Sequence, residues 1–77
     1  MKLQILGTGC ANCKRLTENT EAAVKSLGLD ATIEKVEDIR EIVKFRVLST
    51  PALVVDGKVV LAGRVLPAQA IASLLKA

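Results

Sequence analysis

The chain has 77 residues, of which 51% are apolar and a single one, Phe45, is aromatic, and its formal net charge is +3. This length predicts one domain over residues 1–77 without room for a second, with a core built from Leu, Ile, Val and Ala. The apolar runs are far shorter than the roughly 20 residues that cross a bilayer, which excludes a membrane span. Basic and acidic residues are interspersed and aromatic side chains for stacking on bases are lacking, so we expect no nucleic-acid binding.

The first predicted element is a strand over residues 2–6 (KLQIL). Leu3 and Ile5 alternate with polar neighbours, and Gly7 and Gly9 end the strand. The short apolar stretch lacks the features of a signal peptide, so we expect a cytoplasmic protein. A purely structural disulfide would be unusual in that reducing compartment.

A helix is predicted from Ala11 to the residue before Gly28, because apolar side chains recur there at spacings of three and four residues. Glycine readily adopts the left-handed conformation that closes many helices, so Gly28 is placed to cap this one. The predicted inner face consists of Cys13, Leu16, Thr20, Ala23, Val24 and Leu27. Cys10 would then lie at the N-terminus of the helix.

A second strand is predicted over residues 31–36 (ATIEKV), which contain β-branched side chains. A strand, helix, strand unit nearly always crosses over with a right hand, so the two strands should lie side by side and parallel. Asp38 is predicted to cap a second helix, with Glu41 in the capping-box position, and Pro51 excludes helix before it. The residues predicted to face inward are Ile39, Ile42, Val43 and Val47.

The last part of the chain is predicted to form a hairpin and a helix. Asp56-Gly57 lies between two apolar runs, residues 52–55 and 59–61, and favours a tight turn because both central positions need positive φ. Pro67 is preorganised for the first position of a last helix. The predicted inner face of this helix consists of Ala70, Ile71, Leu74 and Leu75. The element order is therefore β-α-β-α-β-β-α, which is an α/β fold.

Cys10 and Cys13 are the only cysteines, and their spacing allows disulfide chemistry. Residues three apart at a helix start lie about 5–6 Å apart, within the separation that a disulfide tolerates. The helix N-terminus, Lys14 and Arg15 are expected to stabilise a thiolate on Cys10, whereas Cys13 should be buried one turn further on. Cys10 would attack a substrate disulfide, and Cys13 would resolve the mixed disulfide.

Two other interpretations of the cysteine pair stay open on these residues. Two thiolates can hold copper(I), so the pair also fits a soft-metal binding or delivery protein, although heavy-metal-associated domains run β-α-β-β-α-β. A structural zinc site would need two further ligands, in a chain without histidine. An interaction module with merely buried cysteines would leave both thiols resistant to alkylation. Cys-x-x-Cys beside a strand, helix, strand unit favours redox chemistry.

The motif GTGCANCK (7–14), the segment STPALVVDGKVVLAGRV (49–65) and the element order resemble the thioredoxin superfamily, most closely its small stand-alone thioredoxin-like or glutaredoxin-like redox-active disulfide proteins. The resemblance spans the chain and implies a minimal thioredoxin fold, with a four-stranded mixed sheet in the order 2-1-3-4. Helices would cover both faces, the first on one and the other two on the opposite face. It also implies a cis Thr50–Pro51 bond beside the disulfide, with Thr50 offering backbone hydrogen bonds to an extended substrate. Gly63 would let the backbone approach this site closely.

Residues that tune the chemistry in this superfamily differ here. Ala11 and Asn12 replace the Gly-Pro typical of thioredoxins and the Pro-Tyr typical of glutaredoxins. The glutaredoxin residues that help to bind glutathione have no counterpart in AGRVLP, and the chain has no tyrosine. Gln4 lies on the first strand but is no base, so the sequence assigns no residue to the deprotonation of Cys13.

The sequence therefore predicts a cytoplasmic protein disulfide oxidoreductase that works through Cys10 and Cys13 and needs no bound cofactor or metal. Its predicted partners are disulfide-containing proteins and an external disulfide reductase that recharges it. We expect a monomer that binds neither membranes nor nucleic acids.

Overall fold

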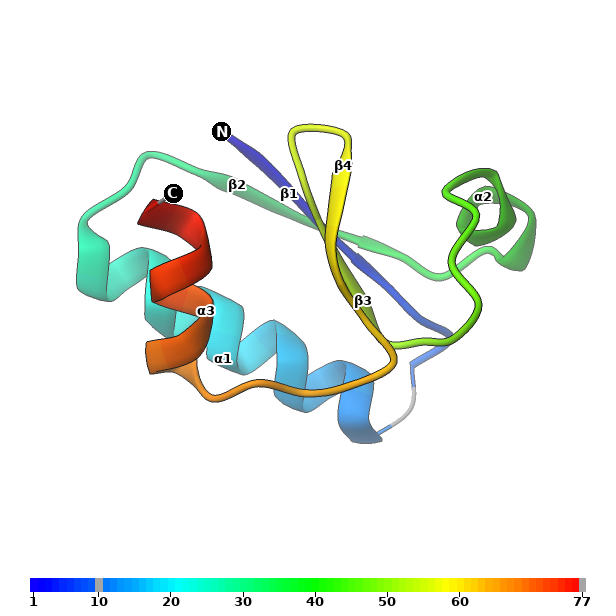
Figure 1. The fold of residues 1–77 in the computed structure, drawn as a ribbon, viewed down its shortest axis with the longest axis horizontal. Coiled ribbons are helices and arrows are strands. Elements are labelled where there is room, and N and C mark those ends of the chain that lie inside the picture. The colour runs from blue at the N-terminus through cyan, green and yellow to red at the C-terminus, as the bar shows by residue number, and fades with distance from the viewer. Residues whose placement is uncertain (10, 77) are drawn as a thin grey trace.

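The structure is a computed structural model that describes residues 1–9 and 11–76. Its elements are β1 (Lys2–Leu6), α1 (Ala11–Leu27), β2 (Thr32–Val36), α2 (Ile39–Lys44), β3 (Ala52–Val55), β4 (Lys58–Ala62) and α3 (Ala68–Lys76) (Figure 1). This order confirms the predicted β-α-β-α-β-β-α arrangement. Within the described part of the chain, no helix combines the length and apolar character that crossing a membrane requires.

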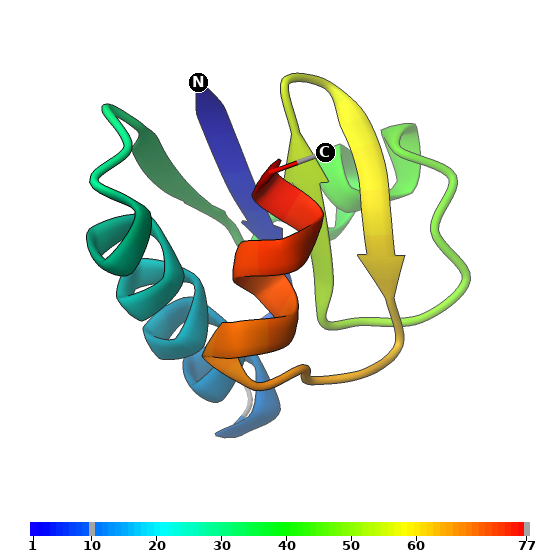
Figure 2. The same ribbon diagram turned by 60° about the vertical axis from the view of Figure 1, so that its left-hand side comes forward.

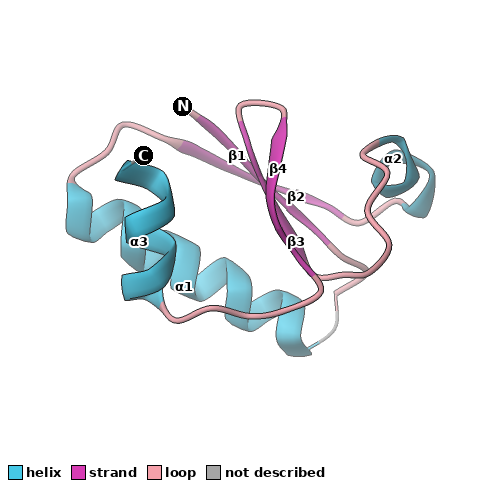
Figure 3. Cartoon of the chain, viewed as in Figure 1, coloured by secondary structure: helices cyan, strands magenta, loops and turns pink. Residues whose placement is uncertain are grey.

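The four strands form one mixed sheet in the predicted order β2-β1-β3-β4. β1 runs parallel to β2 and antiparallel to β3, and β3 pairs with β4 as an antiparallel hairpin. Leu6, the last residue of β1, pairs with Val36 on one side and with Ala52 on the other. The segment that follows β1 and the segment that precedes β3 therefore lie at the same end of the two central strands, as Figure 3 shows.

Helices cover both faces of the sheet, but α3 lies on the same face as α1 and only α2 lies on the other (Figure 2). This corrects the expectation that the second and third helices share a face. The α1 and α3 face holds the larger buried cluster: Leu3, Ile5, Leu16, Ala23, Leu53, Leu61, Ile71 and Leu75. These side chains come from β1, β3 and β4 as well as from the two helices, so α1 alone does not cover the sheet, and α3 completes the burial.

The opposite face carries a smaller cluster, which a short helix suffices to cover. Its buried residues are Leu6, Val36, Ile42, Ala52 and Val54, with Phe45, Val47 and Val59 packed against them. Within α2 only Ile42 is buried, whereas Ile39 and Val43 are 60% and 64% exposed, contrary to prediction. Consecutive helical residues are about 100° apart around the axis, so Val43 turns away when Ile42 faces the sheet.

The last helix also exposes one residue that was predicted to face inward. Leu74 is 37% exposed, whereas Ile71 and Leu75 belong to the larger cluster. Ala72 packs against that cluster instead. The inward face of α3 is thus rotated slightly from the predicted one.

Hydrogen bonds at the end of α1 confirm the predicted cap. Gly28 has φ +63°, its N–H donates to the Lys25 carbonyl at 3.2 Å, and the Leu29 N–H donates to the Val24 carbonyl at 3.1 Å. These two bonds form a Schellman motif, which satisfies carbonyls that the end of a helix leaves without partners.

The predicted cap of α2 and the predicted hairpin turn are also present. The Asp38 side chain accepts a hydrogen bond from the Arg40 N–H at 2.9 Å and so caps α2. Asp56 and Gly57 have φ of +48° and +86°, as a type I′ turn requires. The helix cap and the turn both follow from interactions between residues that are close in the sequence.

Candidate active site

The candidate active site lies where β1 passes into α1. The Gly7 N–H donates to the Val36 carbonyl at 3.0 Å and so extends the pairing with β2 by one residue. Thr8 and Gly9 are exposed and lead towards the start of α1. Cys10, the predicted nucleophile, lies outside the described residues.

Cys13 is in the first turn of α1 and is only 5% exposed, as expected from the helical pattern. A Cβ atom at Gly7 would overlap the Cys13 Sγ atom and lie 3.2 Å from the Cys13 Cβ atom. Gly7 therefore leaves the space that the Cys13 side chain occupies. The sequence pattern predicts only that Gly7 ends a strand, and its GTGC context is the one signal of this closer role.

The segment before β3 lies at the same edge of the sheet, since Ala52 pairs with Leu6. The Thr50–Pro51 peptide bond is cis, Pro51 is buried and Thr50 is exposed. The Gly63 N–H donates to the Pro51 carbonyl at 2.9 Å, so two of the predicted substrate-binding residues are hydrogen-bonded neighbours. The substrate-binding roles of Thr50, Pro51 and Gly63 stay predictions.

Gly63 is constrained by its backbone and by a neighbour. It has φ +77°, and a Cβ atom there would overlap the hydroxyl of Ser49. The lack of a side chain lets the chain after β4 run close to the segment that enters β3. The close approach to the site that the resemblance implied for Gly63 stays a prediction.

A pocket of about 340 Å³ lies beside Cys13. It is lined by Ile5, Gly7, Thr8, Gly9, Cys13, Lys14, Thr17, Lys35 and Glu37. Lys35 and Glu37 were not predicted from the sequence as residues of the site. The only signal was the predicted parallel pairing of residues 31–36 with the first strand, which brings the end of β2 beside the end of β1.

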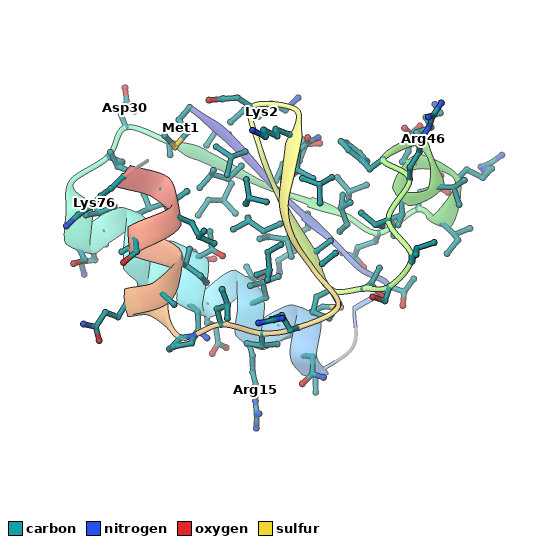
Figure 4. All side chains as sticks on the ribbon, in the orientation of Figure 1. Met1, Lys2, Arg15, Asp30, Arg46 and Lys76 are labelled. Carbon is teal, nitrogen blue, oxygen red and sulfur yellow. The ribbon has the colours of Figure 1, made fainter. Side chains whose placement is uncertain are left out.

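The two basic residues that follow Cys13 are placed differently. Lys14 lines the pocket, whereas Arg15 projects away from α1 into solvent (Figure 4). The Thr17 hydroxyl donates to the Cys13 carbonyl at 2.9 Å, so this buried polar group has its partner inside the helix. The expected effect on a thiolate stays a prediction for both Lys14 and Arg15.

A comparison with protein families finds that a family model described as a thioredoxin domain matches residues 1–76. The chain belongs to the thioredoxin family. It is 44% identical over 75 residues to a thioredoxin of Methanothermobacter thermautotrophicus, which covers 97% of each chain. It is also 39% identical over 74 residues to a thioredoxin of Methanocaldococcus jannaschii, covering 96% of this chain and 85% of that protein.

Membership of the thioredoxin family and the observed topology confirm the predicted superfamily and fold. Thioredoxins are protein disulfide oxidoreductases, and thiol–disulfide oxidoreduction is the general activity of this chain. The copper alternative finds no support in these relatives. Among the described residues, no group of three or more His, Cys, Asp or Glu side chains is placed to hold a metal ion.

Proposed function

We propose that this thioredoxin-family protein reduces or exchanges disulfides of other proteins through Cys10 and Cys13. The Cys10 thiolate attacks one sulfur of the substrate disulfide, which forms a mixed disulfide and releases the other substrate sulfur as a thiolate. The Cys13 thiolate then attacks the Cys10 sulfur, forms the Cys10–Cys13 disulfide and releases the second substrate sulfur. The substrate disulfide is thereby reduced to two thiols, and the cysteine pair is oxidised.

The observation that supports this proposal best is the burial of Cys13 against Gly7, three positions after Cys10. A buried thiol is shielded from external disulfides, which favours an intramolecular role as resolving cysteine. Cys10 is then the cysteine that attacks the substrate disulfide. The exposed Thr50 beside buried Pro51, at the same edge of the sheet, supports a binding site for an extended substrate segment that includes Gly63.

The other parts of the proposal follow from this mechanism and from the family. The Cys10–Cys13 disulfide is itself the redox group, so no cofactor is needed, and an external disulfide reductase restores the two thiols. Lys14 and Arg15 favour the Cys10 thiolate by their positive charge. We propose that the protein acts in the cytoplasm as a monomer with one domain over residues 1–77.

The mechanism is tested with Cys10→Ser and Cys13→Ser variants, a disulfide-bonded protein substrate and a small dithiol as reductant. With the dithiol present, Cys10→Ser is expected to abolish turnover. Pre-reduced Cys13→Ser, mixed with the substrate after the dithiol has been removed, is expected to accumulate a mixed disulfide at Cys10 that mass spectrometry identifies. Turnover that survives the loss of Cys10 would contradict the mechanism. Counting free thiols of the wild-type protein in thiol–disulfide buffers gives the reduction potential of the Cys10–Cys13 pair. A value of roughly −200 to −270 mV would support a cytosolic reductant or exchanger, and one near −120 mV would make the protein an oxidant.

A further inference from the structure

The resolving step needs a proton acceptor, because the thiolate and not the thiol attacks a disulfide. Cys13 is buried on α1, so its proton has to leave through the atoms that surround it. Gln4, the polar residue in the middle of β1, is no base. Among the described residues, the pocket beside Cys13 offers a route, and it connects this buried side chain with the exposed Lys35 and Glu37.

The charged groups that line this pocket come from two parts of the chain that pack around Cys13. Lys14 comes from α1 and Lys35 from β2, and Glu37 is the residue that follows β2. Lys35 pairs with Ile5 in the sheet, which turns its side chain towards the α1 face. The Glu37 Oε2 atom lies 3.5 Å from the place of a Cβ atom on Gly9, so the carboxylate lies beside the loop that leads into the cysteine pair.

These side chains differ in what they can do with a proton. Ammonium groups such as those of Lys14 and Lys35 carry donors and no acceptor, and threonine hydroxyls are very weak bases. A carboxylate is a pure acceptor. Among the described residues that line the pocket, Glu37 is the one that carries a carboxylate.

We propose that Glu37 accepts the Cys13 proton during resolution, through water in the pocket, and this rests on the proposed function above. The pocket of about 340 Å³ is far larger than the roughly 30 Å³ share of one water molecule. In the step, the Cys13 S–H bond breaks and the proton passes to the carboxylate. The S–S bond between Cys13 and Cys10 then forms as the bond between Cys10 and the leaving sulfur breaks.

The rate of this step is measured with the aryl disulfide of thionitrobenzoate, whose leaving thiolate is coloured. Attack by Cys10 releases one thiolate, and attack by Cys13 on the mixed disulfide releases a second one in a separate phase. Glu37→Gln is expected to slow the second phase about tenfold at pH 7, since a positioned base contributes at least that much. The first phase is expected to stay unchanged, and Glu37→Asp is expected to recover part of the rate.

The pH profile separates proton transfer from a structural effect. At a pH high enough for hydroxide to deprotonate Cys13 directly, the Gln variant is expected to approach the wild-type rate. A slow second phase at every pH would mean that the substitution disturbs the packing. A faster second phase at pH 7 would mean that the carboxylate merely repels the thiolate. Either result, or an unchanged rate, would overturn the proposal.

Glu34→Gln is the matched control, with the same loss of charge within β2, the strand that Glu37 follows. Glu34 pairs with Gln4 and so points to the α2 face, where it forms an exposed ion pair with Lys2 at 3.8 Å. This variant is expected to leave both phases unchanged, and thermal unfolding verifies that all variants are folded. A wild-type protein that releases only one thiolate and forms no internal disulfide would refute the proposed function itself, whatever Glu37 does.

Discussion

A hydrogen atom at Gly7 stands where any other residue would place a Cβ atom against the Cys13 sulfur. Glycine is required at this position for steric reasons and not for its backbone angle, because any side chain would collide with the Cys13 sulfur. Gly28 has the opposite requirement, with φ +63° and nothing within 4 Å of the place that a Cβ atom would take. The two glycines therefore separate packing from backbone conformation within one chain.

Gly7→Ala is expected to lower the free energy of unfolding of the reduced protein by about 1–3 kcal/mol, as overpacking of a core does. Because the obstacle is the Cys13 sulfur, Cys13→Ala in the same chain should recover part of this loss. Chemical denaturation of the two single variants and the double variant measures the coupling. Gly28→Ala, combined with Cys13→Ala in the same way, should show none. Strictly additive losses at Gly7 and Cys13 would contradict the contact.

The turn of the β3–β4 hairpin is joined to the first strand as well as to its own strands. The Asp56 Oδ1 atom accepts a hydrogen bond from the Lys2 N–H at 2.7 Å, and the Asp56 N–H donates to the Lys2 carbonyl at 2.8 Å. The hairpin is thus held in register on β1, and with it the Thr50–Pro51 segment at the other end of β3. Asp56 does this with φ +48°, a conformation that aspartate and asparagine tolerate better than most residues.

Asp56→Ala is expected to lower the free energy of unfolding by about 1–3 kcal/mol, since alanine loses the side-chain hydrogen bond and resists positive φ. Asp56→Asn keeps an acceptor oxygen and tolerates the backbone angle, so its loss should be less than about 1 kcal/mol. Denaturant titration of the three proteins tests the comparison. Equal losses in the two variants would mean that the negative charge, and not the turn geometry, is what matters.

Across the whole molecule, the two faces of the sheet are buried to different extents. α1 and α3 enclose the larger cluster, and the Asn19 side chain of α1 donates to the Leu66 carbonyl just before α3 at 2.8 Å. α2 has six residues, of which only Ile42 is buried. Elements with few buried contacts open at lower free energy than the rest of a protein.

Amide hydrogen exchange followed by NMR is therefore expected to be faster in α2 than in the middle of α1. The comparison is between the amide of Phe45, the C-cap of α2, which donates to the Ile42 carbonyl, and the amides around the fully buried Thr20. The opening free energy of α1 should approach that of global unfolding, and that of α2 should lie clearly below it. Equal protection of the two helices would show that the smaller cluster is as stable as the larger one.

Most of the fold was predictable because its signals are local. The glycine cap of α1, the Asp38 cap of α2 and the Asp56-Gly57 turn act within a few residues of chain. The face of α3 was not, because a helical period shows that a helix has an apolar side but not which sheet face that side covers. Ile39 and Val43 were assigned inward for a related reason: α2 has less than two turns, and its rotation depends on what the sheet leaves uncovered.

The sequence by itself determined the cysteine spacing, the position of Cys13 on the inner side of a helix and the order of elements along the chain. The tertiary structure alone decided that Cys13 packs against Gly7 and that Lys35 and Glu37 line the same pocket. The parallel register of β1 and β2 brings Lys35 and Glu37 beside the end of β1, and the packing of α1 against the sheet brings Cys13 to Gly7. Strand periodicity carries no information on register with a neighbour, because shifting a strand by two residues leaves the same side chains on each face.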